Sequence, residues 1–351
     1  MIRQMWWKIL SVLLLLYTLT MGLLVPLNSG ITDVSPSSGK TGEQLNISIK
    51  GYNSSFDDEH GKIRAWLKLD NERSLAATAI KVINVRQLQL TFSIPQYLPI
   101  KDRVKDFTLI VDNPQDGASV LPSAVFITQD SIDPVIGQKT WVNTPITQLS
   151  ERKAFTFPFR NILGETIRNQ YFHVPLWFAM IFLFLFSVIY SARYLRTFDA
   201  DYDQRALALT TTGVIFGMLG LFTGAIWAKN TWGAYWSWDI KQNMTAVAML
   251  IYFAYFILRG AFQDAEKRAR LGAVYNIFAF VALIPLIFVI PRLVDSLHPG
   301  AGGNPAFGRD DLDNTMRMVF YPAGIGWTLF GFWVASIAYR TSRLQAIAED
   351  I

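Results

Sequence analysis

Cysteine is absent from the 351-residue chain, and histidine occurs only three times. Without thiols the protein can form no disulfide framework, no thiolate-bound metal site and no cysteine nucleophile. Any metal must therefore be held by histidine, by carboxylates or by some softer donor. The placement of three histidines consequently limits what the chain can bind.

Charged residues are also scarce. They make up 17% of the chain, against 51% hydrophobic and 14% aromatic residues, a balance that is typical of an integral membrane protein rather than a soluble domain. The formal net charge is +5, but the lysines and arginines gather beside hydrophobic runs instead of forming a basic patch. This pattern indicates contact with membrane lipid and no nucleic-acid function.

Six hydrophobic stretches are long enough to cross a hydrocarbon core of roughly 30 Å. They cover residues 6–27, 173–192, 207–228, 243–262, 271–291 and 316–339. The first could instead be a cleaved signal peptide, since Arg3 and Lys8 precede its apolar run. No Ala-x-Ala-like site follows, and the run is long for a signal core, so we expect a retained anchor.

The third predicted span carries a stripe of glycines, Gly213, Gly217, Gly220 and Gly224. Small residues at this spacing let a neighbouring helix approach closely in lipid. We interpret the stripe as a packing device rather than as part of a chemical site.

Basic residues in the short loops predict the orientation, because they accumulate on the cytoplasmic side. One set of loops and the C-terminal tail is rich in them: Arg193, Arg196, Arg205, Arg259, Lys267, Arg268, Arg270, Arg340 and Arg343. The alternate segments carry fewer: Lys229, Lys241, Arg292 and Arg309. Both termini are therefore predicted to be cytoplasmic, with a short tail at 341–351.

The polar stretch 30–129, between the first two spans, is predicted to be a separate soluble domain. Runs such as 44–49, 87–92 and 107–111 alternate apolar with polar residues or are rich in β-formers, and turn residues separate them. Several short strands at this spacing predict an all-β, immunoglobulin-like sandwich.

The ends of this stretch carry a resemblance of their own. The segments 31–42 (ITDVSPSSGKTG) and 113–117 (NPQDG) resemble the immunoglobulin-like IPT/TIG domain. Residues 130–170 contain prolines and no long periodic run, and we expect them to be a linker to the membrane domain at 171–340.

A dense aromatic segment, TWGAYWSWD at residues 231–239, lies between the third and fourth spans; we call it the aromatic shelf. His173 stands at the start of the second span, and His298 lies between the fifth and sixth. Two crossings separate each of these features from the next, so all three must share one face of the membrane. The charge bias makes this face the exterior or periplasmic one.

Two imidazoles on one membrane face, with aromatic rings between them, suit haem. Each neutral imidazole can give one nitrogen lone pair to an axial position of the iron. The rings of Trp232, Tyr235, Trp236 and Trp238 could stack on or edge the apolar macrocycle. The propionates would need cations, for which Lys229, Lys241, Arg168 and Arg292 are available.

Simpler interpretations stay open for the single residues. The two histidines could begin a zinc or copper site, although neither has a second histidine at ligand spacing. Each tryptophan could be an interfacial anchor, and His173 could be a polar residue at the start of a helix. Asp239 could cap the fourth span, or it could pair with Lys241 and hold the shelf's shape. His60 is expected to be a solvated loop residue of the soluble domain.

The shelf and its surroundings resemble a known family. Residues 224–239 (GAIWAKNTWGAYWSWD) resemble the tryptophan-rich WWD motif of haem-handling proteins in cytochrome c maturation. Residues 171–175 (YFHVP) and 296–299 (SLHP) resemble the two external histidine motifs that flank this motif in the CcmC family. The resemblance covers about half of the chain, from 160 to 340. Larger haem lyases of the CcmF and CcsA types share the motif but carry further histidines inside their spans.

The resemblance implies a six-span protein that binds haem b through His173 and His298 at the periplasmic face of a bacterial inner membrane. It implies delivery to a CcmE-like haem chaperone, together with CcmA/CcmB-like exporter subunits and a small CcmD-like subunit, rather than catalysis. A haem lyase acting directly on apocytochrome c is the alternative, and a surface binding protein anchored by its spans is a third. Two features depart from the CcmC pattern: Lys241 replaces the usual arginine, and a β-sandwich follows the first span.

Overall fold

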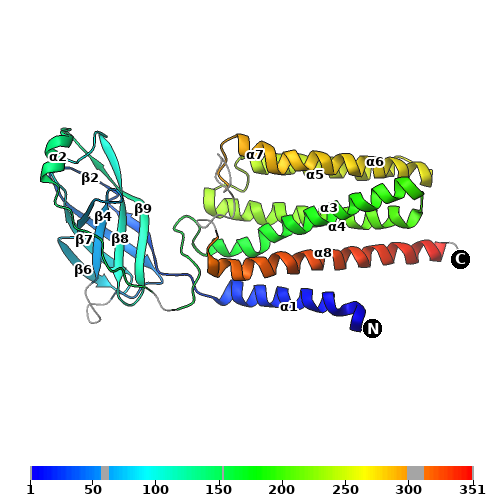
Figure 1. Cartoon of the computed structure of the whole chain (residues 1–351), viewed down its shortest axis with the longest axis horizontal. Coiled ribbons are helices and arrows are strands. Elements are labelled where there is room, and N and C mark those ends of the chain that lie inside the picture. Colours follow the sequence, from blue (N-terminus) through cyan, green and yellow to red (C-terminus); the bar gives the residue numbers. More distant parts are fainter. Residues whose placement is uncertain (1, 57–62, 152–153, 299–311, 350–351) are drawn as a thin grey trace. The chain divides into compact units, whose positions relative to one another are not determined.

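The computed structural model describes residues 2–56, 63–151, 154–298 and 312–349, and the chain forms two compact units. One unit comprises Pro26–Gly164, and the other comprises Met1–Val25 with Glu165–Ile351. Figure 1 shows the first as packed strands and the second as long helices. We call them the β unit and the membrane unit. His60, which was expected to be a solvated loop residue, lies outside the described residues.

The β unit contains two sheets. Its strands are β1 (Gly30–Ser35), β2 (Ser38–Lys40), β3 (Gln44–Tyr52), β4 (Arg64–Lys68), β5 (Ser74–Ala76), β6 (Ala79–Asn84), β7 (Gln87–Ser93), β8 (Val104–Asn113) and β9 (Gly117–Thr128). One sheet has the order β1-β3-β7-β6, and the other has the order β2-β9-β8-β4-β5. The three predicted strands are confirmed as β3, β7 and β8.

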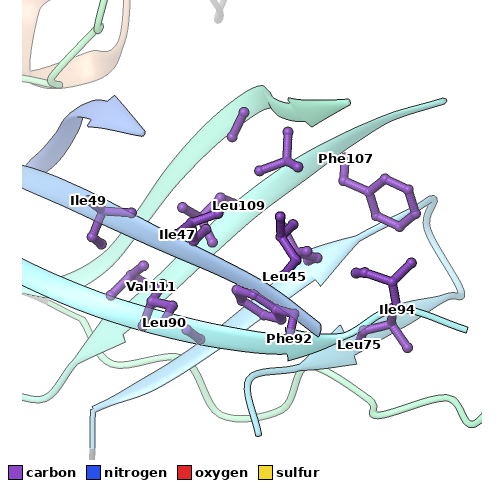
Figure 2. Close-up of a cluster of buried hydrophobic side chains, with 14 of the residues drawn as sticks. Leu45, Ile47, Ile49, Leu75, Leu90, Phe92, Ile94, Phe107, Leu109 and Val111 are labelled. Atoms are coloured by element: carbon purple, nitrogen blue, oxygen red, sulfur yellow. The ribbon is translucent and has the colours of Figure 1, made fainter. Parts of the chain in front are cut away.

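Alternation along these strands builds the core of the β unit. In β3 and β7 every second residue is buried, for example Ile47 and Leu90, and their neighbours face outward. Phe107 and Leu109 of β8 meet them from the second sheet (Figure 2). Each such side chain contributes about 1.5–3 kcal/mol when it leaves water. The sheets are thus held together by their facing apolar surfaces.

The segment after β9 packs onto the β unit. Helix α2 (Pro134–Thr140) is capped by Asp133, whose carboxylate accepts hydrogen bonds from two backbone amides of its first turn. Gly137 lies against the backbone of Leu98, where an added Cβ would be 2.3 Å from the carbonyl oxygen. Leu27 and Phe157 form a parallel bridge near the ends of the unit. Much of the segment expected to be a linker therefore lies within the compact β unit.

Six helices of the membrane unit are long and apolar enough to cross a membrane, which confirms the prediction of six spans. The membrane unit contains α1 (Ile2–Leu24), α3 (Gln170–Thr197), α4 (Ala200–Trp232), α5 (Ile240–Gly260), α6 (Ala265–Ile284), α7 (Ile290–Leu293) and α8 (Asn314–Glu349). A 3-10 turn, η1 (Gly164–Asn169), leads into α3, and a π-turn, η2 (Pro285–Val289), joins α6 to α7.

Helix α3 lies at the centre of the membrane unit. It packs against α4, α6 and α8, while α1 packs against α8 and α5 against α6. The long helices run side by side, with α7 at one end of the bundle (Figure 1). Helix α1 begins and α8 ends at the opposite end (Figure 1). The two ends of the bundle therefore present different sets of loops.

The glycine stripe of α4 receives large side chains from α3. An added Cβ would come within 2.5 Å of Phe184 at Gly213, and within 2.6 Å of His173 at Gly224. At Gly220 it would lie 2.7 Å from the indole of Trp177. The predicted packing role is thus correct, and the last two glycines of the stripe also lie against residues of the candidate site.

Candidate functional site

The aromatic shelf begins where α4 ends. Gly233 has a positive φ of 83°, a conformation that glycine adopts without strain, and its amide donates to the carbonyl of Lys229. The ammonium of Lys229 donates to the carbonyl of Gly233 at 2.8 Å and lies 5.8 Å from the ring centre of Tyr235. The C-terminus of α4 is therefore capped by Gly233, a residue of the shelf.

The first turn of α5 holds the rest of the shelf in place. The side-chain oxygen of Gln242 accepts hydrogen bonds from the amide and the hydroxyl of Ser237. The amide group of Asn243 donates to the carbonyl of Trp238 at 2.8 Å. Trp238 has a left-handed φ of 58° and is 79% exposed. Such a backbone costs a bulky residue about 1–3 kcal/mol, so the hydrogen bonds hold this indole in an outward position.

Asp239 joins the shelf to the segment that carries His298. Its carboxylate accepts a hydrogen bond from the backbone amide of Lys241 and so caps α5. It also accepts hydrogen bonds from the hydroxyl of Ser296 and the amide of Leu297. Nδ1 of His298 lies 2.8 Å from Asp239 Oδ1. Asp239 is thus both a helix cap, as one expectation had it, and the partner of a histidine 59 residues away.

Electrostatics at this pair favour a neutral imidazole beside an ionised carboxylate. Burial lowers the pKa of His298 below its ordinary value, an effect that exceeds the attraction of Asp239. Burial alone would raise the pKa of Asp239, but hydrogen bonds from the amides of Leu297 and Lys241 bring it below its usual range. The proton of neutral His298 then lies on Nδ1, facing the carboxylate, and the lone pair of Nε2 points away from Asp239.

His173 lies in the first turn of α3, against α4. The helix begins at Gln170, directly after η1, so His173 lies at the start of a helix, as one expectation had it. Its Nδ1 lies 3.1 Å from the carbonyl oxygen of Gly220 and 3.1 Å from the hydroxyl of Thr223. A carbonyl can only accept, so Nδ1 carries the proton and Nε2 has the lone pair.

Three indoles surround the two histidines. Trp177 and Trp227 meet the ring of His173 edge-on, with centroids 6.0 and 5.8 Å away. Trp232 meets the ring of His298 in the same way at 4.7 Å. Trp227 and Trp232 both belong to the last turns of α4. The two histidines therefore contact the same end of one helix, as the counting of crossings predicted.

The imidazoles and aromatic rings at the C-terminal end of α4 suit haem. In both imidazoles Nδ1 is held by an acceptor and the lone pair is on Nε2, which is the arrangement found when histidine binds a metal. Tyr235 and Trp238, which are 60% and 79% exposed, offer aromatic surface to an apolar macrocycle. Zinc would need a third or fourth protein ligand, and the described part of the chain has no group of three or more histidine and carboxylate side chains that could hold a metal ion.

The cations proposed for the propionates have different surroundings. Arg168 pairs with Glu165 and donates to the carbonyls of Gly22 and Val25, so it secures the end of α1. Lys229 lies at the shelf, as described above. Lys241 is in the first turn of α5 and half-buried, and Arg292 is exposed on α7. Lys229 and Lys241 are thus the cations that flank the shelf in sequence and in space.

Several residues of the site were not found from the sequence alone. Trp177 lies one helical turn after His173, a spacing that could have suggested contact. Gln242 and Asn243 follow the shelf directly, where polar residues commonly bond to a preceding loop. The acceptor at Gly220 and the contact between Asp239 and His298 depend on how distant helices are aligned, for which a single sequence gives no local signal.

Most of the membrane unit is similar in sequence to known proteins. Residues 135–350 match the family of heme exporter protein C, CcmC. The heme exporter protein C of Bradyrhizobium diazoefficiens is 28% identical over 182 residues, which are 52% of this chain and 68% of the relative. That of Escherichia coli is 25% identical over 184 residues, 52% and 70% of the two chains. That of Rhodobacter capsulatus is 26% identical over 206 residues, 56% and 82%. The family match includes both histidines, the aromatic shelf and all the membrane helices except α1, and the chain belongs to the heme exporter protein C family.

Proposed function

We propose that this protein binds haem b at the membrane surface between His173 and His298 and presents it for cytochrome c maturation. The observation that carries the proposal is the hydrogen bond from His298 to Asp239 of the aromatic shelf, which fixes the imidazole beside the exposed aromatic rings. His173 contacts the same end of α4 with its own Nδ1 held by Gly220. The family supplies the ligand class, because its members are named heme exporter protein C.

Each part of the site has a task in this proposal. Haem would bring an iron that binds imidazole nitrogen and a flat, apolar ring. Nε2 of His173 and Nε2 of His298 would hold the iron. Trp232, Tyr235, Trp236 and Trp238 would cover the ring, and Lys229 and Lys241 would meet the propionates. A lysine at 241 keeps the charge of the family's usual arginine without its two-pronged hydrogen bonding.

Delivery, rather than catalysis, is the role that these residues support. A covalent bond to haem would need a nucleophile, and the chain has no cysteine and one histidine beyond the two at the site. We propose that haem passes to a CcmE-like chaperone in the periplasm, with CcmA/CcmB-like and CcmD-like subunits as partners in the membrane. In this orientation the shelf is periplasmic and both termini are cytoplasmic.

A transfer assay separates this function from that of a haem lyase. The full chain, loaded with haem in detergent, is mixed in parallel with a CcmE-like chaperone and with an apocytochrome c. We expect haem absorbance to move to the chaperone and no covalent cytochrome to form. Covalent haem on the apocytochrome without the chaperone would establish the lyase instead, and failure of the chain to load haem would contradict both.

A further inference from the structure

The two proposed axial ligands differ in what surrounds Nε2. The indole nitrogen of Trp177 donates a hydrogen bond to Nε2 of His173 at 3.3 Å. This is the nitrogen that would bind iron, because Nδ1 is held by the carbonyl of Gly220. At His298 the held nitrogen is likewise Nδ1, whose partner is the carboxylate of Asp239, but no described residue donates a hydrogen bond to its Nε2.

A neutral imidazole has one lone pair at Nε2. It can accept the indole proton or bind iron, but not both. Iron at His173 must therefore replace the hydrogen bond from Trp177. A neutral hydrogen bond of this kind contributes about 0.5–1.5 kcal/mol, which corresponds to a roughly 3- to 10-fold effect on an equilibrium.

Packing keeps Trp177 where it can compete. It lies one turn after His173 on α3, and its ring fills the space left by the missing side chain of Gly220. A Cβ at Gly220 would come within 2.7 Å of the indole. Gly220 thus packs against the indole of Trp177 through its Cα, and its carbonyl oxygen orients the imidazole of His173. The packing of α3 against α4 therefore restricts the rotamer of Trp177 and keeps its indole close to His173.

The partners of the two Nδ1 atoms also differ in strength. A carboxylate partner raises the electron-donating power of an imidazole ligand more than a neutral carbonyl does. His298 therefore has the stronger partner, while His173 has a weaker one and a competitor at the ligating nitrogen.

We propose that Trp177 competes with iron for Nε2 of His173 and so makes His173 the axial ligand that is released first. This inference rests on the proposed haem function. Trp177 acts here as a positioning residue: it returns its hydrogen bond to His173 when the iron leaves, which lowers the barrier to hand-over while His298 still holds the haem.

The test compares haem release from three forms of the full chain. Wild type, Trp177→Phe and Trp227→Phe are loaded with haem in detergent and mixed with excess apomyoglobin, and the transfer rate is read by absorbance. Trp177→Phe should release haem roughly 3- to 10-fold more slowly. Trp227→Phe is the matched control: its indole also meets the ring of His173 edge-on, but its nitrogen donates to Thr166. It should slow release clearly less than Trp177→Phe does, because it removes no hydrogen bond to Nε2.

Carbon monoxide binding to the reduced protein provides a second readout. CO must take an axial position, so its binding rate reports release of the weaker ligand. Trp177→Phe should slow CO binding by a similar factor, and this effect should vanish when His173 is replaced by alanine in both backgrounds. Trp177→Leu serves as the donor-free variant if Trp177→Phe does not accumulate in the membrane.

The outcomes distinguish this inference from the function on which it rests. An unchanged or faster release in Trp177→Phe, an equal slowing in Trp227→Phe, or an effect that persists without His173 would overturn the competition alone. A wild-type protein without a six-coordinate haem spectrum would overturn the haem function, and the competition with it.

Discussion

Single residues fix which nitrogen of each histidine carries the lone pair. At His298 the carboxylate of Asp239 holds Nδ1, and at His173 the carbonyl of Gly220 does so. Asp239 has further tasks, because it also caps α5 and binds the backbone next to His298. A change at this position should therefore affect ligand strength as well as local order.

Asp239→Asn should weaken haem binding by roughly 10- to 100-fold, the usual cost of changing the partner of a metal-bound histidine. The amide has the size of the carboxyl but no charge to strengthen the imidazole. Haem titration measures the affinity, and redox titration should show a more positive potential, because a weaker donor favours ferrous iron.

Asp264→Asn is the control for the loss of a helix cap. Asp264 caps α6 by accepting a hydrogen bond from the amide of Lys267 at 2.6 Å, without a histidine partner. It should leave haem affinity unchanged. Equal weakening by both substitutions would mean that the effect of Asp239 comes from capping and not from His298.

The sequence was sufficient to predict that His173, His298 and the aromatic shelf lie at the same end of the bundle, because counting crossings needs only the spans. It was not sufficient to identify the partners of the histidines. Spacing along one helix shows which residues share a face, but the alignment of α3 against α4 depends on packing over the full length of both helices. Gly220 could be assigned to the site only after that alignment was known, whereas the one-turn spacing of Trp177 after His173 on α3 could have suggested their contact.

At the scale of elements, the pairing of α3 with α4 builds half of the site. Four glycines on α4 receive large side chains from the facing surface of α3, and His173 occupies the last of these positions. The position of the imidazole is therefore set by the register of two helices. A side chain added at one of these glycines should displace the α3 side chain that packs against it.

Gly224→Ala should displace His173, since the new Cβ would lie 2.6 Å from its Cε1. We expect the ferric haem to change from six-coordinate low spin to five-coordinate high spin, with His298 as the remaining ligand. Optical and electron paramagnetic resonance spectra measure this change.

Gly213→Ala provides the comparison within the same stripe. Its Cβ would meet the ring of Phe184 at 2.5 Å, far along α3 from the histidine. Overpacking should cost about 1–3 kcal/mol of stability and leave the coordination unchanged. A six-coordinate spectrum in Gly224→Ala would show that His173 is not held by this contact.

At the scale of the whole molecule, the residues of the proposed haem site belong to one of two units. The described contacts of His173, Asp239 and His298 all lie within the membrane unit. The family match begins at residue 135 and leaves out the nine strands. Alternation predicted the sheets, as β3 and β7 show, but the resemblance to an IPT/TIG domain stays a prediction.

Phe107→Ala should destabilise the β unit by about 3–5 kcal/mol, because this fully buried ring fills the core between the sheets. The haem spectrum should not change if the site is confined to the membrane unit. Proteolysis of the β unit and the haem spectrum are measured on the same preparation.

Val104→Ala is the matched control on the same strand, since Val104 is 51% exposed. It should alter neither proteolysis nor spectrum. Loss of haem in Phe107→Ala would show that the β unit contributes to the site.

Absence of cysteine makes the orientation of the chain easy to test. Asp295, in the exposed segment next to His298, and Gln263, in the loop between α5 and α6, are each replaced by cysteine. The span α5 separates Gln263 from the shelf. In bacterial cells with a permeable outer membrane, a membrane-impermeant thiol reagent should label the first and not the second. The reverse labelling would place the shelf on the cytoplasmic side.

The most direct measurement of the central claim is the optical spectrum of the purified full chain beside three histidine variants. We predict a six-coordinate, low-spin haem in wild type and in His60→Ala, which removes the one histidine outside the site. His173→Ala and His298→Ala should each lose this spectrum. If wild type lacks it, or if either variant retains it unchanged, these two histidines are not the axial ligands of a haem.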